Sequence, residues 1–301
     1  MDDSKTRNVI MKTIMVRALY FILFFLFSLI WSCTSNPFGS DNNISNNTVI
    51  GNVELNDGLS PKNVFAWFKV FDISARTDEE GHFELTLPPS GSQAAGGLNG
   101  IYSLYFYMAN YQLDSVQIVI TNGNIQASST GVKNNGELVQ TVQLAKLLDI
   151  KISFSSSSLV ENQVDPIIIN FTVEAKIDEV DVTADFSQSS GKGDPQFIVG
   201  FARKINSDEE FCMGIFRENR SHGAIDFQIS NNPIELLPLE IFYKPDTFTI
   251  GEYEVIPSLV IKQNLPIGLL DSLGNKVGET CKNIFNVPLR IKNNRFQVVS
   301  G

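Results

Sequence analysis

Two histidines and two carboxylate clusters are the residues of this 301-residue chain whose types could carry chemistry. His82 lies in an alternating segment next to Phe83, and His222 lies in an Arg-Ser-His-Gly stretch that is typical of a turn. A histidine that acts as a base or a metal ligand needs a partner group, yet neither one begins an H-x-x-E motif. We interpret both as solvated side chains and predict no catalytic residue.

The carboxylate clusters are Asp-Glu-Glu at 78–80 and again at 208–210. Calcium binds oxygen-rich loops of this kind, but it takes ligands at alternating positions. Neither cluster has that spacing, and acidic turns are common in a chain with 33 acidic and 23 basic residues. We therefore predict no metal site and no cofactor. The net charge of −10 also argues against a nucleic-acid partner, whose phosphates need a basic face.

Aromatic residues offer a third kind of chemistry, because their rings can stack on sugars. Five of them fall in one third of the chain: Trp67, Tyr102, Tyr105, Tyr107 and Tyr111. They alternate with apolar residues such as Phe68 and Leu104, so ordinary packing competes with a glycan-stacking surface. Known catalytic motifs, among them G-x-S-x-G, H-E-x-x-H and G-x-G-x-x-G, do not occur in the sequence.

The N-terminus has the pattern of an export signal. Four basic residues within the first 17 precede an apolar run from Ala18 to Trp31, which is too short to span a bilayer. Met1 and Met11 are both possible starts. The run ends in Ile30-Trp31-Ser32-Cys33, which resembles a bacterial lipobox. The resemblance implies that residues 1–32 are a signal peptide and that Cys33 carries lipid, such as palmitate. The alternative is an uncleaved N-terminal anchor.

Residues 33–47 are rich in Ser, Asn and Gly and predict a flexible tether between the anchor and the body. Both readings of the N-terminus place the rest of the chain outside the cytoplasm, on a membrane of the bacterial cell envelope. Thr34 rather than Asp after the cysteine favours the outer membrane, on its periplasmic face or at the cell surface. Without residues 1–32 the chain keeps 19 basic and 31 acidic residues, a net charge of −12.

The elements that must position these residues are β-strands. From Thr48 onward apolar residues recur at every second position, for example at 83, 85 and 87 and again from Ile167 to Ala175. One buried and one solvated face is typical of antiparallel sheets packed as a sandwich. We therefore predict an all-β fold of two tandem β-sandwiches, with strands that include 64–71, 148–154, 284–291 and 295–299, and a single helical turn within 265–273.

The first sandwich, residues 48–146, is marked by its turns. It has an opening strand with an internal Gly51, a Thr-Asp-x-x-Gly-x-Phe turn at 77–83, a Leu-Pro pair at 87–88 and a strand that starts Gly-x-Tyr at 100–102. This order resembles the carboxypeptidase regulatory-like domain, a transthyretin-like β-sandwich. Insertion 90–99 departs from the family pattern. The resemblance implies an accessory or adhesive module without catalysis of its own.

The second sandwich, residues 147–301, resembles no family, and its pattern indicates an immunoglobulin-like arrangement. It holds Cys212 and Cys281. Export would place both in an oxidising compartment, which favours a disulfide, whereas two buried thiols are the alternative. Their roughly 70-residue loop would gain about 4 kcal/mol from the bridge on a chain-entropy model.

Two functions fit these observations. The first is a membrane-anchored cell-envelope lipoprotein that acts as a non-catalytic binding or structural module, with an envelope protein or a glycan as its partner. The second is an accessory subunit or an enzyme of glycan processing. The lack of a recognisable nucleophile and base favours the first.

Overall fold

The period-two alternation of the sequence becomes a series of β-strands in the computed structural model. The structure describes residues 47–93, 97–128, 130–184, 197–205, 212–217, 225–236, 238–274 and 286–301. By its internal contacts Asn46–Gly301 is one compact unit, and residues 1–46 lie outside the described residues. The two sandwiches of the predicted all-β fold are both present within Asn46–Gly301.

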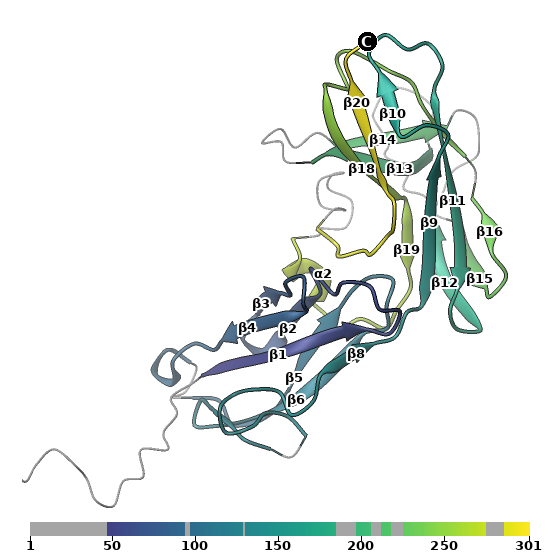
Figure 1. Cartoon of the computed structure of the whole chain (residues 1–301). Coiled ribbons are helices and arrows are strands. Elements are labelled where there is room, and N and C mark those ends of the chain that lie inside the picture. The colour runs from purple at the N-terminus through teal and green to yellow at the C-terminus, as the bar shows by residue number, and fades with distance from the viewer. Residues whose placement is uncertain are drawn as a thin grey trace, which may run out of the picture. The chain divides into compact units, whose positions relative to one another are not determined.

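The first sandwich packs a sheet of order β4-β1-β8 on a sheet of order β3-β2-β5-β6-β7 (Figure 1). Its strands are β1 (Thr48–Leu55), β2 (Phe65–Phe68), β3 (Ile73–Arg76), β4 (His82–Thr86), β5 (Gly100–Tyr107), β6 (Asp114–Thr121), β7 (Asn124–Gln126) and β8 (Val142–Leu144). Two short 3-10 turns are η1 (Lys69–Phe71) and η2 (Ser90–Ser92). The predicted strand 64–71 is thus shorter than expected, because the chain turns at η1.

The core of the first sandwich is built from alternate residues of both sheets. Val49 and Val53 of β1 meet Phe106 of β5 and Ile118 of β6 in one buried cluster. The rings of Phe83 and Phe106 pack edge to face with their centroids 5.3 Å apart. Full burial of each such side chain contributes about 1.5–3 kcal/mol, so this cluster dominates the stability of the sandwich.

The 77–83 turn forms as the sequence predicts. The Asp78 carboxylate accepts hydrogen bonds from the backbone N–H groups of Glu80 (3.1 Å) and His82 (2.8 Å). Gly81 has a φ of 86°, a left-handed conformation that glycine adopts without strain. The turn therefore holds β4 beside β1, with Gly51 opposite Phe83.

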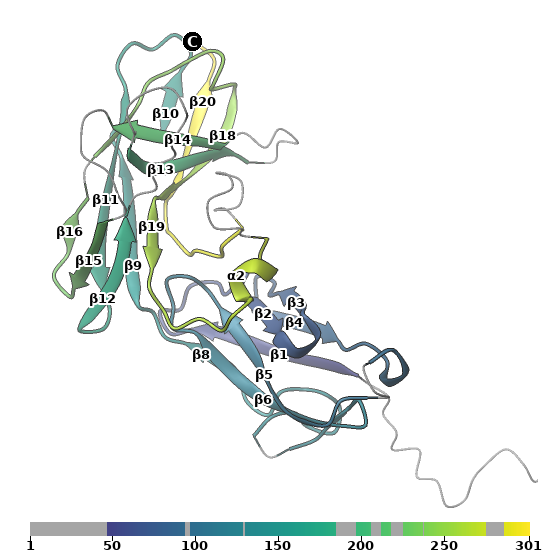
Figure 2. The ribbon, with the colours of Figure 1, turned by 180° about the vertical axis from the view of Figure 1, so that it is seen from behind.

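The second sandwich contains three sheets, of order β10-β20-β18-β13-β14, β16-β11-β17 with β9 also paired to β11, and β15-β12-β19 (Figure 2). Its strands are β9 (Leu148–Phe154), β10 (Ser158–Val160), β11 (Ile167–Ala175), β12 (Glu179–Ala184), β13 (Phe197–Lys204), β14 (Cys212–Arg217), β15 (Ile225–Ser230), β16 (Ile234–Glu235), β17 (Leu239–Ile241), β18 (Gly251–Pro257), β19 (Leu259–Ile261) and β20 (Arg295–Val299). The predicted strands 148–154 and 295–299 are confirmed.

Strand β11 is the centre of this sandwich because one of its faces is buried along its whole length. Ile169 and Phe171 pack with Tyr253 and Phe296 in one cluster, whereas the other end of the same face joins a second cluster around Val182. The rings of Tyr253 and Phe296 stack with centroids 5.4 Å apart. The predicted alternation of β11 is confirmed.

Residues 262–274 and 286–291, which we name the C-terminal strap, form the main departure from the predicted elements. The helical turn predicted within 265–273 appears as α2 (Leu269–Ser272). The strand predicted at 284–291 is not formed in its described part, 286–291. Pro288 has no N–H to give to a sheet, and its carbonyl instead accepts a hydrogen bond from the Ala109 N–H (2.7 Å).

The C-terminal strap packs on the sheet of the first sandwich that contains β2 and β5. Figures 1 and 2 both show α2 beside β2 and β3. Leu269 and Leu273 are buried against Phe65, Trp67 and Tyr107. The strap lies beyond residue 147 in the sequence, yet it packs back on the first sandwich. It covers the face of the sheet from which Phe65, Trp67 and Tyr107 project.

Candidate functional site

Of the residues first considered for catalysis and calcium, the structure describes His82 and residues 78–80, and these form no shared site. His82 is exposed on β4, and the Asp78 carboxylate is engaged by its own turn. Glu79 pairs with Lys62 at 2.6 Å, which together with a bond from Ser60 holds the pKa of this exposed carboxyl below its usual value. No group of three potential His, Cys, Asp or Glu ligands gathers anywhere in the described part of the chain.

The five aromatic residues do not share an exposed surface, which corrects the expected glycan-stacking platform. Trp67, Tyr107 and Tyr111 are 2%, 4% and 0% exposed. Tyr102 packs toward the sandwich core, whereas Tyr105 lies on the opposite face beside Trp67, with ring centroids 6.0 Å apart. Burial raises the pKa of Tyr107 to about 12. These rings serve mainly as packing: Tyr102 and Tyr111 belong to the core of the first sandwich, and the C-terminal strap covers the face from which Trp67 projects.

Several predicted residues lie outside the described residues. They are Cys33 with the lipobox, His222, residues 208–210 and Cys281. The backbone of Cys212 is in β14, and the disulfide stays a prediction. No helix within the described ranges is both long enough and apolar enough to span a membrane.

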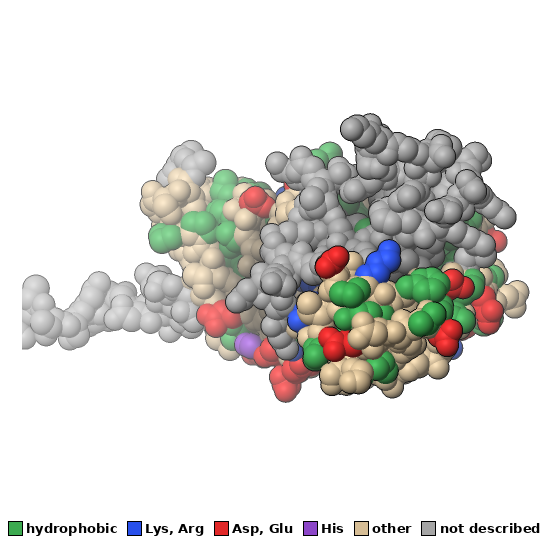
Figure 3. Space-filling view, turned by 90° about the horizontal axis from the view of Figure 1, so that it is seen from above, with side chains coloured by type: hydrophobic (Ala, Val, Ile, Leu, Met, Phe, Trp, Pro, Cys, Tyr) green, Lys and Arg blue, Asp and Glu red, His purple; other side chains and the backbone are tan. Residues whose placement is uncertain are grey.

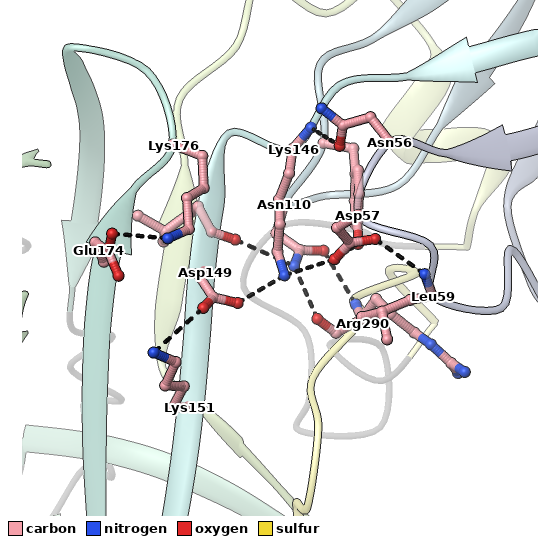
Figure 4. A network of polar contacts seen from close by, with 12 residues as sticks. Asn56, Asp57, Leu59, Asn110, Lys146, Asp149, Lys151, Glu174, Lys176 and Arg290 are labelled. Carbon is pink, nitrogen blue, oxygen red and sulfur yellow. Dashed lines mark hydrogen bonds and ion pairs between the residues drawn. The ribbon is translucent and has the colours of Figure 1, made fainter.

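Lys146 is the centre of a polar network where the first sandwich passes into the second (Figure 4). Its Nζ donates to the Asp57 carboxylate at 2.8 Å and to the Asp149 carboxylate at 2.6 Å. The side chain of Lys146 is only 9% exposed. The Tyr111 hydroxyl also donates to Asp57 (3.0 Å), and the Tyr111 ring centroid lies 5.9 Å from Nζ. We call Lys146, Asp57, Asp149 and Tyr111 the Lys146 network.

The charges of the Lys146 network stabilise one another. Burial alone would raise the pKa of Asp57, but hydrogen bonds from Lys146, the Leu59 N–H and Tyr111 outweigh it and lower that pKa. The same holds for Asp149. Burial alone would raise its pKa, but the hydrogen bond from Lys146 outweighs burial, and the pKa is lowered. Burial disfavours the Lys146 cation, but both carboxylates raise its pKa above the usual value. All three groups are thus held in their charged forms, which suits a structural junction rather than proton transfer.

Two side-chain amides, the buried Asn110 and the half-buried Gln263, bind the C-terminal strap to the same region. The Asn110 side chain donates to the Arg290 carbonyl (2.8 Å) and accepts from the Arg290 N–H (3.0 Å). The Gln263 amide donates to the carbonyls of Ala109 (3.0 Å) and Tyr111 (2.9 Å) and accepts from the Leu113 N–H (2.9 Å). These amides have partners for their buried polar atoms, so they fix the register of the strap.

Beside the strap the described residues form a cleft of about 760 Å³. Its apolar lining consists of Leu59, Ile152, Phe154, Leu289 and Ile291, and its polar lining of Ser153, Ser157, Glu254, Arg290, Lys292, Asn293, Asn294 and Arg295. We name it the strap cleft. Its volume lies in the range of small-ligand sites, about 300–1,000 Å³.

The strap cleft is cationic although the chain is acidic. Arg290, Lys292 and Arg295 lie within six residues, and within the described ranges no carboxylate reaches Arg290 or Lys292 at ion-pair distance. In Figure 4 the Arg290 side chain extends away from Asp149. By contrast, acidic side chains are scattered over the described surface in the view of Figure 3.

Among the described lining residues of the strap cleft, the one acid, Glu254, is already paired. Glu254 accepts two hydrogen bonds from Arg203, at 2.9 and 2.7 Å, and one from the Asn294 amide at 3.1 Å. Arg295 reaches the exposed Glu252 only at 3.5 Å. Among the described residues, the cleft therefore presents Arg290 and Lys292 without an ion pair, next to apolar side chains.

Sequence reasoning missed both arrangements, although each left a signal. Lys146 is the single basic residue in the apolar stretch 142–150, and Asp149 follows three positions later. The run Arg-Ile-Lys-Asn-Asn-Arg at 290–295 places three cations together in a chain with excess acid. The contribution of Asp57 had no local signal, because its contact with Lys146 spans 89 residues.

Comparisons with known proteins add little. No protein-family model and no curated protein matches the chain. Among solved structures, the chain is similar to BcpA, the major pilin subunit of Bacillus cereus, at 11% identity over 71% of this chain and 68% of that chain. The TM-score is 0.21, which is too low to carry an argument.

Proposed function

We propose that this protein is a lipid-anchored component of the bacterial cell envelope, in which two β-sandwiches act as a non-catalytic binding or structural module. The observation that carries the anchor is the short apolar run that ends in Ile30-Trp31-Ser32-Cys33. The tether at 33–47 would separate the body from a membrane, with the outer membrane as the favoured location. The Lys146 network supports this role, because its buried cation and two carboxylates pair with one another where the first sandwich passes into the second.

The anchor is tested by metabolic labelling with a palmitate analogue in a bacterial host. The full chain should incorporate label, and Cys33→Ser should not. Cys212→Ser is the matched control, because it also removes one thiol but should keep the label. Equal labelling of the wild-type chain and Cys33→Ser would contradict the proposal.

The strap cleft favours a second candidate, an accessory role in glycan processing. Its volume suits a short saccharide, and it combines apolar surfaces with serine and asparagine side chains. On this reading the protein holds a glycan near an enzyme and does not cleave it. The two candidates share a binding function, and they differ in whether a processing enzyme is the partner.

A further inference from the structure

The strap cleft joins three features on a protein that is acidic overall. It is concave and of small-ligand size, it has an apolar lining, and its polar lining carries Arg290, Lys292 and Arg295. A cleft lined mainly by positive charge focuses the local field and raises the concentration of anions even where the net charge repels them. The cleft therefore selects for a ligand with an anionic group and a compact body.

The type of anion follows from the donors. A guanidinium binds the two oxygens of a carboxylate through parallel hydrogen bonds, and a lysine adds a point charge. The Arg290 backbone is held by Asn110 at both its N–H and its carbonyl, so the start of its side chain is fixed without use of the guanidinium. That leaves the charged end of Arg290 available to a ligand.

The remaining lining suits a hydroxylated body. Ser153, Ser157 and Asn293 offer neutral donors and acceptors, and Leu289, Ile291 and Phe154 offer apolar surfaces. Sugars present hydroxyl groups at their edges and C–H groups on their faces, so they match such a mixed surface. We propose that the strap cleft binds an acidic saccharide, with its carboxylate at Arg290 and Lys292. The proposal rests on the binding-module part of the proposed function and is independent of the anchor at Cys33.

The probe is tetragalacturonate, and its methyl ester is the matched neutral ligand. Titration calorimetry on the full chain in detergent should show binding of the acid that weakens as salt rises, because screening reduces the charge attraction. The ester should bind roughly tenfold or more weakly, since it loses charge-assisted hydrogen bonds. Equal affinity for acid and ester, or no binding of the acid at millimolar concentration, would overturn the proposal.

Variants locate the site. Arg290→Gln with Lys292→Gln should weaken binding of tetragalacturonate by roughly tenfold or more. Lys69→Gln with Lys244→Gln is the matched control, because it removes the same charge at exposed positions outside the cleft. It should leave the affinity within about twofold. An equal loss in both double variants would overturn the assignment to the cleft, because net charge alone would then explain the binding.

Two further readouts keep the test decisive. Unchanged thermal unfolding of Arg290→Gln with Lys292→Gln is expected, because their side chains have no ion pair within the described residues. Inorganic phosphate serves as a competitor. Competition only at concentrations far above those of tetragalacturonate supports a saccharide site, whereas equal potency would show a simple oxyanion site and overturn the saccharide assignment.

Discussion

At the scale of single residues, Lys146 illustrates how a buried charge is tolerated. Its transfer from water is costly, and two carboxylates and a tyrosine ring compensate for that cost. Asp57 and Asp149 retain 22% and 19% exposure, so solvent also shares in the compensation. The network is therefore best understood as a specific connection between two sandwiches rather than as a large source of stability.

Lys146→Met should destabilise the protein at pH 7 by about 3 kcal/mol, because it leaves two partly buried carboxylates without their cation. Urea unfolding followed by circular dichroism measures the change. Lys62→Met is the control, since it breaks an exposed ion pair with Glu79 and should cost less than about 1 kcal/mol. Equal effects of the two substitutions would show that the Lys146 network adds nothing.

The same variant should alter the response to acid. The pKa values of Asp57 and Asp149 are lowered in the folded protein, so their stabilisation is present above the ordinary aspartate value of 3.8 and is lost as pH falls through the folded values. Without Lys146, both pKa values should be higher than in the wild type, because the largest interaction that opposes burial is lost. The stability gap between wild type and Lys146→Met should therefore narrow from pH 7 to pH 3. A constant gap would refute this.

At the scale of elements, the 77–83 turn depends on Gly81. A Cβ at this position would run into the Val53 carbonyl oxygen and come within 2.6 Å of Pro61, and the φ of 86° is itself strained for other residues. Gly81→Ala should cost about 3 kcal/mol or more in unfolding free energy. Gly58→Ala is the matched control, because its φ is 70° and a Cβ there meets nothing within 4 Å. It should cost about 1 kcal/mol, and thermal unfolding that ranks Gly58→Ala as the worse variant would contradict the structure.

Local patterns predicted elements well where one face of a strand is buried along its whole length. The alternation of β11 is an example, since Ile167 to Ala175 supply one continuous buried face. The segment 286–291 has a similar alternation but forms no strand, because Pro288 interrupts its donors and long-range partners such as Asn110 take its backbone groups. Alternation shows which side chains need burial, and it does not show which surface will bury them.

At the scale of the whole described body, the C-terminal strap links the two sandwiches across the predicted boundary at 146/147. The sequence predicts one of two tandem sandwiches on either side of it. The structure shows Phe65, Trp67 and Tyr107 of the first sandwich buried under residues from the other side of that boundary. A first sandwich without the strap would expose these three rings together, which disfavours its independent stability.

Because the strap packs on the first sandwich, we expect the two sandwiches to unfold together. Leu269→Ala removes a side chain that is 0% exposed and packs in the same cluster as Trp67. It should cost about 2–5 kcal/mol and loosen the cover over Trp67. In a Trp31→Phe background, where Trp67 is the single tryptophan, its emission should shift to longer wavelength and acrylamide should quench it more strongly.

The matched control is Leu159→Ala, which opens a comparable cavity in the core of the second sandwich and is also 0% exposed. It should lower stability by a similar amount and leave native Trp67 emission unchanged, because it belongs to a different cluster from Leu269 and Leu273, the strap residues that cover Trp67. With an intact strap, Trp67 emission and far-ultraviolet circular dichroism should report one transition in urea. In Leu269→Ala with Gln263→Ala, the emission change should come at lower urea, since the first sandwich then loses both the apolar cover and the amide that holds it. Coincident transitions in that double variant would mean that the strap does not couple the sandwiches and that the boundary at 146/147 separates them after all.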